Sequence, residues 1–172
     1  NKSDIRVDLA NRGAQMRAGI ASNGYLSRHD DHHVEIKHSI GNTDSSFVMH
    51  AACDGFSHSV GTGLLSICEG ADGSDAGQVF RNLLLSEKSR AEAIPELEVL
   101  ADDVKAAHGA ASAPIDVDQL HYLASRGLSS DEASALIVEG FLMDAFREIK
   151  SEEVVAVMRT RLLVHLECLV NG

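Results

Sequence analysis

The stretch from Asn82 to Ala111 constrains the fold of this chain more than any other part of the sequence. It reads NLLLSEKSRAEAIPELEVLADDVKAAHGAA and contains three short apolar runs, each of which is followed by polar residues. No run is long enough for an ordinary helix, and Pro95 prevents a helix from passing through it. The stretch therefore predicts short strands that alternate with turns.

The residues before this stretch repeat the same rhythm. Ile5, Val7 and Leu9 alternate with polar residues, a turn is expected at 11–13, and a second alternation follows over 14–18. Further strands are expected at 33–40, 47–53, 64–68 and 78–85, with turns at Asn23-Gly24 and 41–44 and a loop at 69–77. Strands that recur every ~10–15 residues without intervening helices indicate an all-β architecture. Periodicity alone leaves a sandwich and a solenoid open, and the polar turns favour a solenoid.

The period of the apolar residues changes after Pro114, where three amphipathic helices are expected. Capping boxes are expected at Asp116 with Gln119 and at Ser129 with Glu132. The other expectations are a helix stop at Gly127, an N-cap at Ser151, and apolar faces made by Val117, Leu120 and Leu123, by Ala133, Leu136, Ile137, Gly140 and Phe141, and by Val155, Met158, Leu162, Leu166 and Leu169. Part of this apolar surface remains available to the strands or to a partner.

The charge balance excludes one class of partner. Lys and Arg number 15 against 26 Asp and Glu, which gives a net charge of −11 and argues against nucleic acid. No apolar run approaches the ~20 residues of a membrane helix, and the first residues carry no signal core, so a cytoplasmic protein is expected. The odd, widely spaced Cys53, Cys68 and Cys168 predict free thiols in a reducing compartment. Asn1 is not a natural start, which agrees with a fragment.

Motifs in the second half of the chain resemble the SufB/SufD family of iron–sulfur cluster assembly proteins. They are NLLLS at 82–86, IPELEV at 94–99, ADDVK at 101–105 with HGA at 108–110, and LxYLxSRG at 120–127. The resemblance implies a right-handed parallel β-helix over about 5–112, whose stacked coils bury one another's apolar residues, and a helical tail. The expected division is a β-helix part at 1–113 and a helical subdomain at 114–172. The whole would be the C-terminal half of a longer family member, with an open strand edge at its N-terminal end.

The resemblance implies that this chain is a scaffold subunit of a SUF complex and not an enzyme. It would pair with a SufB-like subunit and bind the Suf ABC-type ATPase. His108 matches the family's motif histidine, which implies a ligand or interface residue for a transient iron–sulfur cluster, with no tightly bound cofactor. Without the resemblance, a lone histidine among small residues is more often structural.

Three departures from the family pattern indicate a SufD-like chain. Arg81 stands where SufB-like chains carry a cysteine, and Gly109 stands where they carry a glutamate. Ala106 replaces a cysteine found two residues before the histidine in some SufD chains. Since thiolates usually hold iron–sulfur clusters, we expect that this chain cannot hold one alone.

The helical tail is the second region to which the resemblance assigns a role. In the family these helices bind the ATPase, and the matching segment here runs from 116 to 146. Tyr122, Arg126, Phe141 and Phe146 are the expected anchors, because aromatic and Arg side chains often dominate interfaces. Purely internal packing of these four side chains remains open.

Other polar groups have simpler interpretations. The HDDHH run at 29–33 could bind zinc or nickel, but it is interpreted as a solvated turn before the strand at Val34, because alternate strand positions point to opposite faces. Glu96 and Glu98 are predicted to share a scaffold face. His38, His50 and His58 are expected on strand faces, and His121 and His165 partly exposed on helices.

Two further functions remain open at this stage. A self-pairing SufB-like protein would bind iron or a nascent cluster in a homodimer, with Cys53 or Cys68 supplying the thiolate. A homodimer in isolation could also substitute for the natural heterodimer. A carbohydrate-active β-helix would instead use Glu96 and Glu98 as paired carboxylates.

Overall fold

The computed structural model describes residues 1–170, with side chains except for those of His165 and residues 167–170. The strands are β1 Lys2–Leu9, β2 Gln15–Gly24, β3 His29–His38, β4 Asp44–Cys53, β5 His58–Ile67, β6 Asp75–Leu84, β7 Arg90–Val99 and β8 Lys105–Pro114. The helices are α1 Val117–Ser125, α2 Ser130–Met143, the 3₁₀ turn η1 Asp144–Phe146, and α3 Glu152–Val170. The predictions for His165, Cys168 and Leu169 concern side chains that lie outside the described part of the structure.

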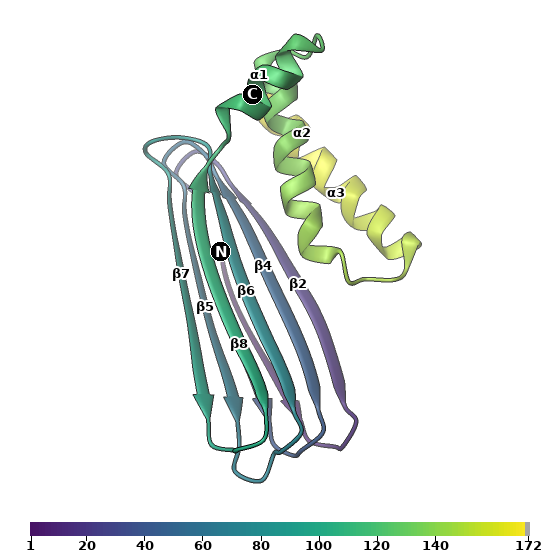
Figure 1. Ribbon diagram of the computed structural model, residues 1–172. Helices are drawn as coiled ribbons and strands as arrows, with labels where there is room; N and C mark the ends of the chain where they lie inside the picture. The colour runs from purple at the N-terminus through teal and green to yellow at the C-terminus, as the bar shows by residue number, and fades with distance from the viewer. Residues whose placement is uncertain (171–172) are drawn as a thin grey trace.

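The strands form a parallel β-solenoid (Figure 1). Odd-numbered strands make one four-stranded sheet in the order β1-β3-β5-β7, and even-numbered strands make the other in the order β2-β4-β6-β8. Every neighbouring pair is parallel and in continuous register, so that each coil contributes one strand to each sheet. The all-β architecture and the parallel β-helix followed by helices are confirmed.

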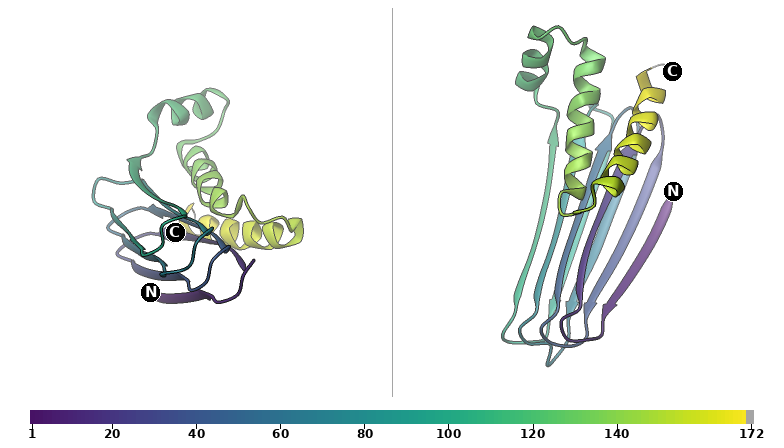
Figure 2. Two further views of the ribbon diagram at one scale, coloured as in Figure 1. Left: turned by 60° about the horizontal axis from the view of Figure 1, so that its bottom comes forward. Right: turned by 90° about the vertical axis from the view of Figure 1, so that its right-hand side faces the viewer.

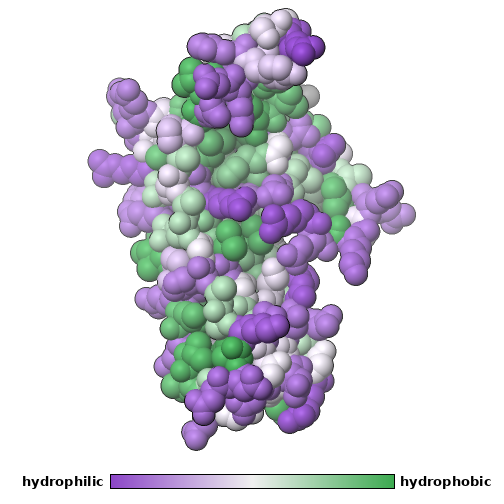
Figure 3. Space-filling model, in the orientation of Figure 1, coloured by the Kyte–Doolittle hydropathy of each residue, from purple (hydrophilic) through white to green (hydrophobic). Residues whose placement is uncertain are grey.

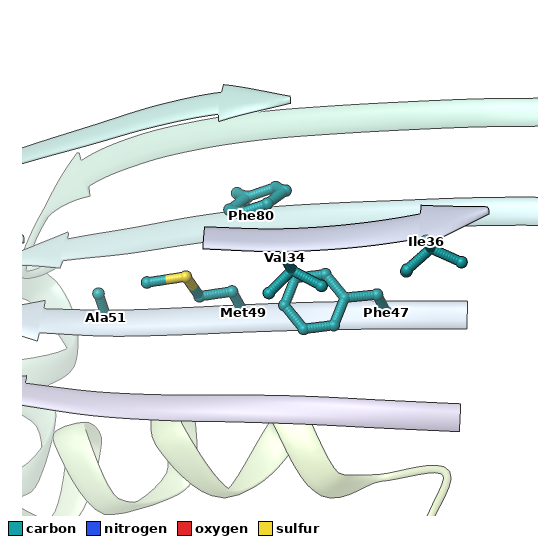
Figure 4. Close-up of a cluster of buried hydrophobic side chains, with 6 residues drawn as sticks. All are labelled: Val34, Ile36, Phe47, Met49, Ala51 and Phe80. Atoms are coloured by element: carbon teal, nitrogen blue, oxygen red, sulfur yellow. The ribbon is translucent and has the colours of Figure 1, made fainter. Parts of the chain in front are cut away.

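The core lies between the two sheets. Alternate residues of each strand point inward, and six of them form a central buried cluster (Figure 4): Val34, Ile36, Phe47, Met49, Ala51 and Phe80. The rings of Phe47 and Phe80 meet edge to face, with centroids 5.6 Å apart. Gly63 makes room for this packing, because a Cβ there would lie 2.6 Å from Cζ of Phe80.

Several strands extend further than the sequence pattern indicated. Asn23 and Gly24 end β2 instead of forming a turn, and β6 begins at Asp75, inside the expected 69–77 loop. The HDDHH run opens β3, so its interpretation as a turn is wrong. A middle strand of a solenoid pairs with a neighbour on each side, and this backbone pairing holds even polar residues in an extended conformation.

The helical segment packs on the outer face of the even-numbered sheet (Figure 2). Ala52 and Leu83 of that sheet join Val138 and Leu142 of α2 and Leu166 of α3 in one buried cluster. Gly19 lets η1 approach closely, since a Cβ there would overlap the carbonyl oxygen of Ala145. Among the described residues, no helix has the length and apolar character needed to cross a membrane.

Most of the capping residues predicted for the helices are confirmed. Ser129 and Glu132 form the expected capping box, Ser151 bonds the backbone N–H of Val154, and Gly127 follows α1 with a φ of 94°. Asp116 caps α1, but the capping box predicted for it is wrong. Its carboxylate accepts a hydrogen bond from the backbone N–H of Asp118, and no returning bond from the Gln119 side chain completes a box.

The predicted apolar face of α2 is displaced by about one residue. Val138 and Leu142 are buried, whereas Leu136 is 48% exposed and Gly140 is exposed. The contacts with the sheet and with α3 select this face, and these contacts are not local in sequence.

Candidate functional site

His108 lies at the end of the solenoid, on the inner side of the last strand. Its register partner in β6 is Gln78, whose amide reaches the carbonyl oxygens of Gly63 and Glu96. Because Gly63 pairs with Pro95 in the next coil, His108 occupies the position opposite Pro95. His108 is exposed because the described chain has no coil beyond β8.

Small side chains surround His108 on this terminal coil. The inward positions are occupied in β7 by Ala91, Ala93, Pro95, Leu97 and Val99 and in β8 by Ala106, Ala110, Ser112 and Pro114. His108 is therefore the one ionisable side chain on the inner face of this coil. β7 and β8 are also edge strands, and edge strands have backbone N–H and C=O groups that are free to pair with another chain. Pro95 is tolerated in β7 because an edge strand has only one neighbour.

The described thiols do not share a site with each other. Cys53 ends β4 and is fully buried, and burial raises the pKa of its thiol. Cys68 follows β5 and is partly exposed. Since β4 and β5 run in opposite directions, the two thiols lie at opposite ends of ten-residue strands that span about 33 Å. The prediction of free thiols is confirmed for these two residues.

The HDDHH run divides between the two faces of β3. Asp30 and His32 point inward with Val34, and the other three residues point outward. Burial acts to raise the pKa of Asp30, but hydrogen bonds from Arg28 at 2.9 and 2.7 Å help to hold that pKa below its usual value. Within the described chain, no three His, Cys, Asp or Glu side chains are grouped so as to hold a metal ion.

Glu96 and Glu98 both lie exposed on the outer face of β7. Glu98 accepts a hydrogen bond from the hydroxyl of Ser66 on the neighbouring strand, at 3.2 Å. The two carboxylates therefore lie on an exposed sheet surface, as the sequence indicated. They point away from the interior of the solenoid, whereas His108 on β8 occupies an inward position.

The four expected anchors of the helical segment fall into two pairs. Tyr122 is 59% exposed on α1, with the Arg126 guanidinium 5.1 Å from its ring centroid. Phe141 instead stacks on the ring of His50, with centroids 4.7 Å apart. Phe146 lies beside Gly19 at the contact between η1 and β2.

The helices and the even-numbered sheet enclose a groove that the sequence pattern missed. It measures about 480 Å³ and lies between the ends of β6 and β8 and the helices α1 and α2, with Leu83, Ala113, Leu136 and Phe141 in its wall. A second depression of about 430 Å³ adjoins it at Tyr122. Figure 3 shows apolar side chains gathered where the helices meet the solenoid. The available signal was Leu136, a residue of the predicted apolar face of α2 that the structure leaves 48% exposed.

These features define a class of protein: a parallel β-solenoid followed by helices that pack on one of its sheets. Residues 1–141 match the family model described as SUF system FeS cluster assembly, SufBD core domain. The chain therefore belongs to the SufB/SufD family, as its motifs indicated.

Individual relatives agree with this assignment. The chain is 36% identical over 159 residues to the iron–sulfur cluster assembly protein SufD of Bacillus subtilis, which covers 88% of this chain and 32% of that protein. It is 33% identical over 90 residues to SufD of Escherichia coli, covering 52% of this chain and 21% of that protein. A SufBD family protein of Mycobacterium leprae is 31% identical over 141 residues, or 82% of this chain and 16% of that protein. The chain thus spans less than a third of the length of these relatives.

Proposed function

We propose that this chain is a SufD-like scaffold subunit of an iron–sulfur cluster assembly complex. Its solenoid end pairs with a SufB-like subunit, and its helical subdomain binds the Suf ABC-type ATPase. The observation that carries the proposal is the end of the solenoid, where the inner face of the last strand presents His108 beside two unpaired strand edges. The chain itself catalyses no covalent step.

The chemistry of this end suits a shared cluster site. The small side chains beside His108 allow another backbone to approach closely, and the free edges of β7 and β8 offer backbone hydrogen bonds. A neutral imidazole is a metal ligand, but iron–sulfur clusters are usually held by thiolates. Neither described thiol lies on β7 or β8, so the partner supplies the thiolates and the cluster is a transient cargo.

We expect His108→Ala to slow cluster formation in the assembled complex by at least tenfold, a loss of about 1.4 kcal/mol in the transition state. The residue is exposed and lies at the end of the solenoid, so the fold and the assembly with the partner should survive. Cluster absorbance over time, with size-exclusion chromatography of the complex, measures both effects. His29→Ala, which changes an exposed histidine on β3, two strands away from β7, is the matched control. A wild-type rate in His108→Ala would remove the ligand role.

The proposed ATPase contact uses the exposed side of the helical subdomain. Tyr122 and Arg126 present a stacked pair beside the two adjoining depressions. Phe141 and Phe146 act indirectly in this proposal, because they hold α2 and η1 against the solenoid. Aromatic and arginine anchors next to an apolar groove are typical of binding hot spots.

Tyr122→Ala is expected to weaken ATPase binding about tenfold, because alanine removes an anchor worth more than 1 kcal/mol. Calorimetry with the Suf ATPase from the same source, with and without nucleotide, measures the dissociation constant. Val157→Ala, which trims a 55% exposed side chain on α3, should bind as the wild type does. Unchanged binding by both Tyr122→Ala and Arg126→Ala would place the docking surface elsewhere.

A further inference from the structure

Two histidines stand side by side on the outer face of the odd-numbered sheet, at the starts of β3 and β5. His29 and His58 are register partners on these neighbouring strands, and their ring centroids lie 4.8 Å apart. The backbone N–H of His58 donates to the carbonyl oxygen of Arg28 at 2.9 Å, which aligns the two strand starts. The stacking of coils therefore holds the two imidazoles together, although they belong to successive coils.

The separation of the two rings suits a shared metal ion. Zinc binds an imidazole nitrogen at about 2.0–2.1 Å, which places the centre of each ring about 3.2 Å from the ion. Two such rings at a tetrahedral angle have centres about 5.2 Å apart. The rings of His29 and His58 are 4.8 Å apart and cross at 81°, so a side-chain rotation at the exposed His29 suffices to place both rings around one ion.

Glu92 gives a second, independent indication of a metal site. Its carboxylate lies 2.9 Å from Nε2 of His58. An ionised carboxylate only accepts, so the Nε2–H of the neutral ring donates and the lone pair stays on Nδ1. Histidines that bind metals almost always donate their other ring N–H to a carboxylate, a carbonyl or water, which fixes the tautomer and raises the basicity of the ligand nitrogen. Glu92 thus prepares His58 to act as a ligand.

His29 is the open side of the pair. It is exposed, and its ring makes no hydrogen bond to any residue that the structure describes. The next strand of the sheet offers no further ligand in this row, because Arg90 is the register partner of His58 on β7. The pair therefore supplies two ligands, fewer than the three-residue groups that are absent from the described chain, and leaves the remaining coordination positions to water.

We propose that His29 and His58 together bind one Zn²⁺ ion, with Glu92 as the outer carboxylate that orients His58. Imidazole suits zinc, copper and nickel, whereas Mg²⁺ and Ca²⁺ prefer oxygen ligands. Fe²⁺ stands below Zn²⁺ in the usual order of affinities, so the iron of cluster assembly is a weaker occupant. The pair is also separate from His108, which points inward on β8, and cluster formation does not depend on it.

Calorimetry of the full chain with zinc chloride tests the proposal. We expect saturable binding of one ion per chain, with a dissociation constant below about 0.1 mM, and no binding of Mg²⁺ at the same concentrations. His29→Ala and His58→Ala should each weaken zinc binding by at least about tenfold, because only one imidazole is left. His121→Ala, which changes an exposed histidine outside the pair, should bind zinc as the wild type does.

The outer carboxylate has its own test. Glu92→Gln keeps the size of the side chain and should weaken zinc binding about tenfold, the lower end of the usual loss when such a partner is removed. Glu96→Gln, which changes an exposed acid on the same face of β7, should leave zinc binding unchanged. Circular dichroism of each variant checks the fold. Zinc binding at wild-type strength in His29→Ala or Glu92→Gln, equal binding of Mg²⁺, or no saturable zinc binding below about 1 mM would overturn the proposal.

Discussion

Replacing Phe80 with alanine is expected to lower the free energy of unfolding by about 3–5 kcal/mol, the usual cost of removing a buried phenylalanine. Phe80 is 1% exposed and packs edge to face with Phe47 across neighbouring coils. Gly61 and Gly63 leave the space that its ring fills, since a Cβ on either residue would approach the ring to 3.0 Å or less. Alanine would leave a cavity that the rigid backbone ladders close only in part.

Urea unfolding followed by circular dichroism measures this loss. Phe56→Ala is the matched control, because Phe56 is 64% exposed in a turn, with the Lys88 ammonium 4.8 Å from its ring centroid. Removing the Phe56 ring should lower the free energy of unfolding by no more than about 1 kcal/mol. Similar losses for the two variants would contradict the packing described for the core.

Lowering the pH from 7.5 to 5.5 is expected to destabilise the protein through buried histidines. His38 is fully buried, and its two ring nitrogens bond the hydroxyl groups of Thr43 at 2.7 Å and Ser45 at 2.8 Å. His50 is 1% exposed, and its Nδ1 donates to the carbonyl oxygen of Phe141 at 2.6 Å. Burial lowers the pKa of both imidazoles, and it also lowers the pKa of His32.

The sign follows from the folded pKa values, which lie below the unfolded value of about 6.5. Above pH 6.5 these imidazoles are neutral in both the folded and the unfolded state, so they do not change the free energy of unfolding. Below it the unfolded chain binds protons that the folded chain does not, so the unfolding free energy falls until the folded pKa is reached. One proton per histidine is the most by which the two states can differ, so each histidine adds at most about 1.4 kcal/mol per pH unit to the slope.

Urea unfolding at pH 7.5, 6.5 and 5.5 checks this dependence. His38→Gln keeps a polar side chain without a titrating ring, so its stability should fall less steeply with pH than that of the wild type. His121→Gln changes an exposed histidine on α1 and should leave the slope unaltered. A free energy of unfolding that is constant from pH 7.5 to 5.5 would show that the buried imidazoles gain protons without penalty.

Local patterns were sufficient to predict the elements of this fold. Val34, Ile36 and His38 alternate, and the structure places all three on the inner face of β3. The signals at Ser129 and Gly127 set the start of α2 and the end of α1. These features succeed because alternation, capping and glycine conformation depend on residues within a few positions of one another.

The polar half of β3 shows what local patterns could not predict. Asp30 is 1% exposed because Arg28, Ser22 and Asn1 bond its carboxylate inside the solenoid. Two of these partners come from β2 and from the residue before β1, which the stacking of coils brings to Asp30. In the sequence alone, the polar run at 29–33 has no visible hydrogen-bond partners, and such a run is typical of a turn.

The candidate sites divide in the same way. The motif around His108 was visible in the sequence and indicated the family, but only the structure places the residue on the inner face of an edge strand. The separation of Tyr122 from Phe141 depends on which face of α2 meets the sheet. Sequence periodicity determined where the strands and helices lie, but most strands begin earlier than the pattern indicated. Only the tertiary structure decided which polar groups are buried and which surfaces remain open, because residues about thirty positions apart become neighbours when the coils stack.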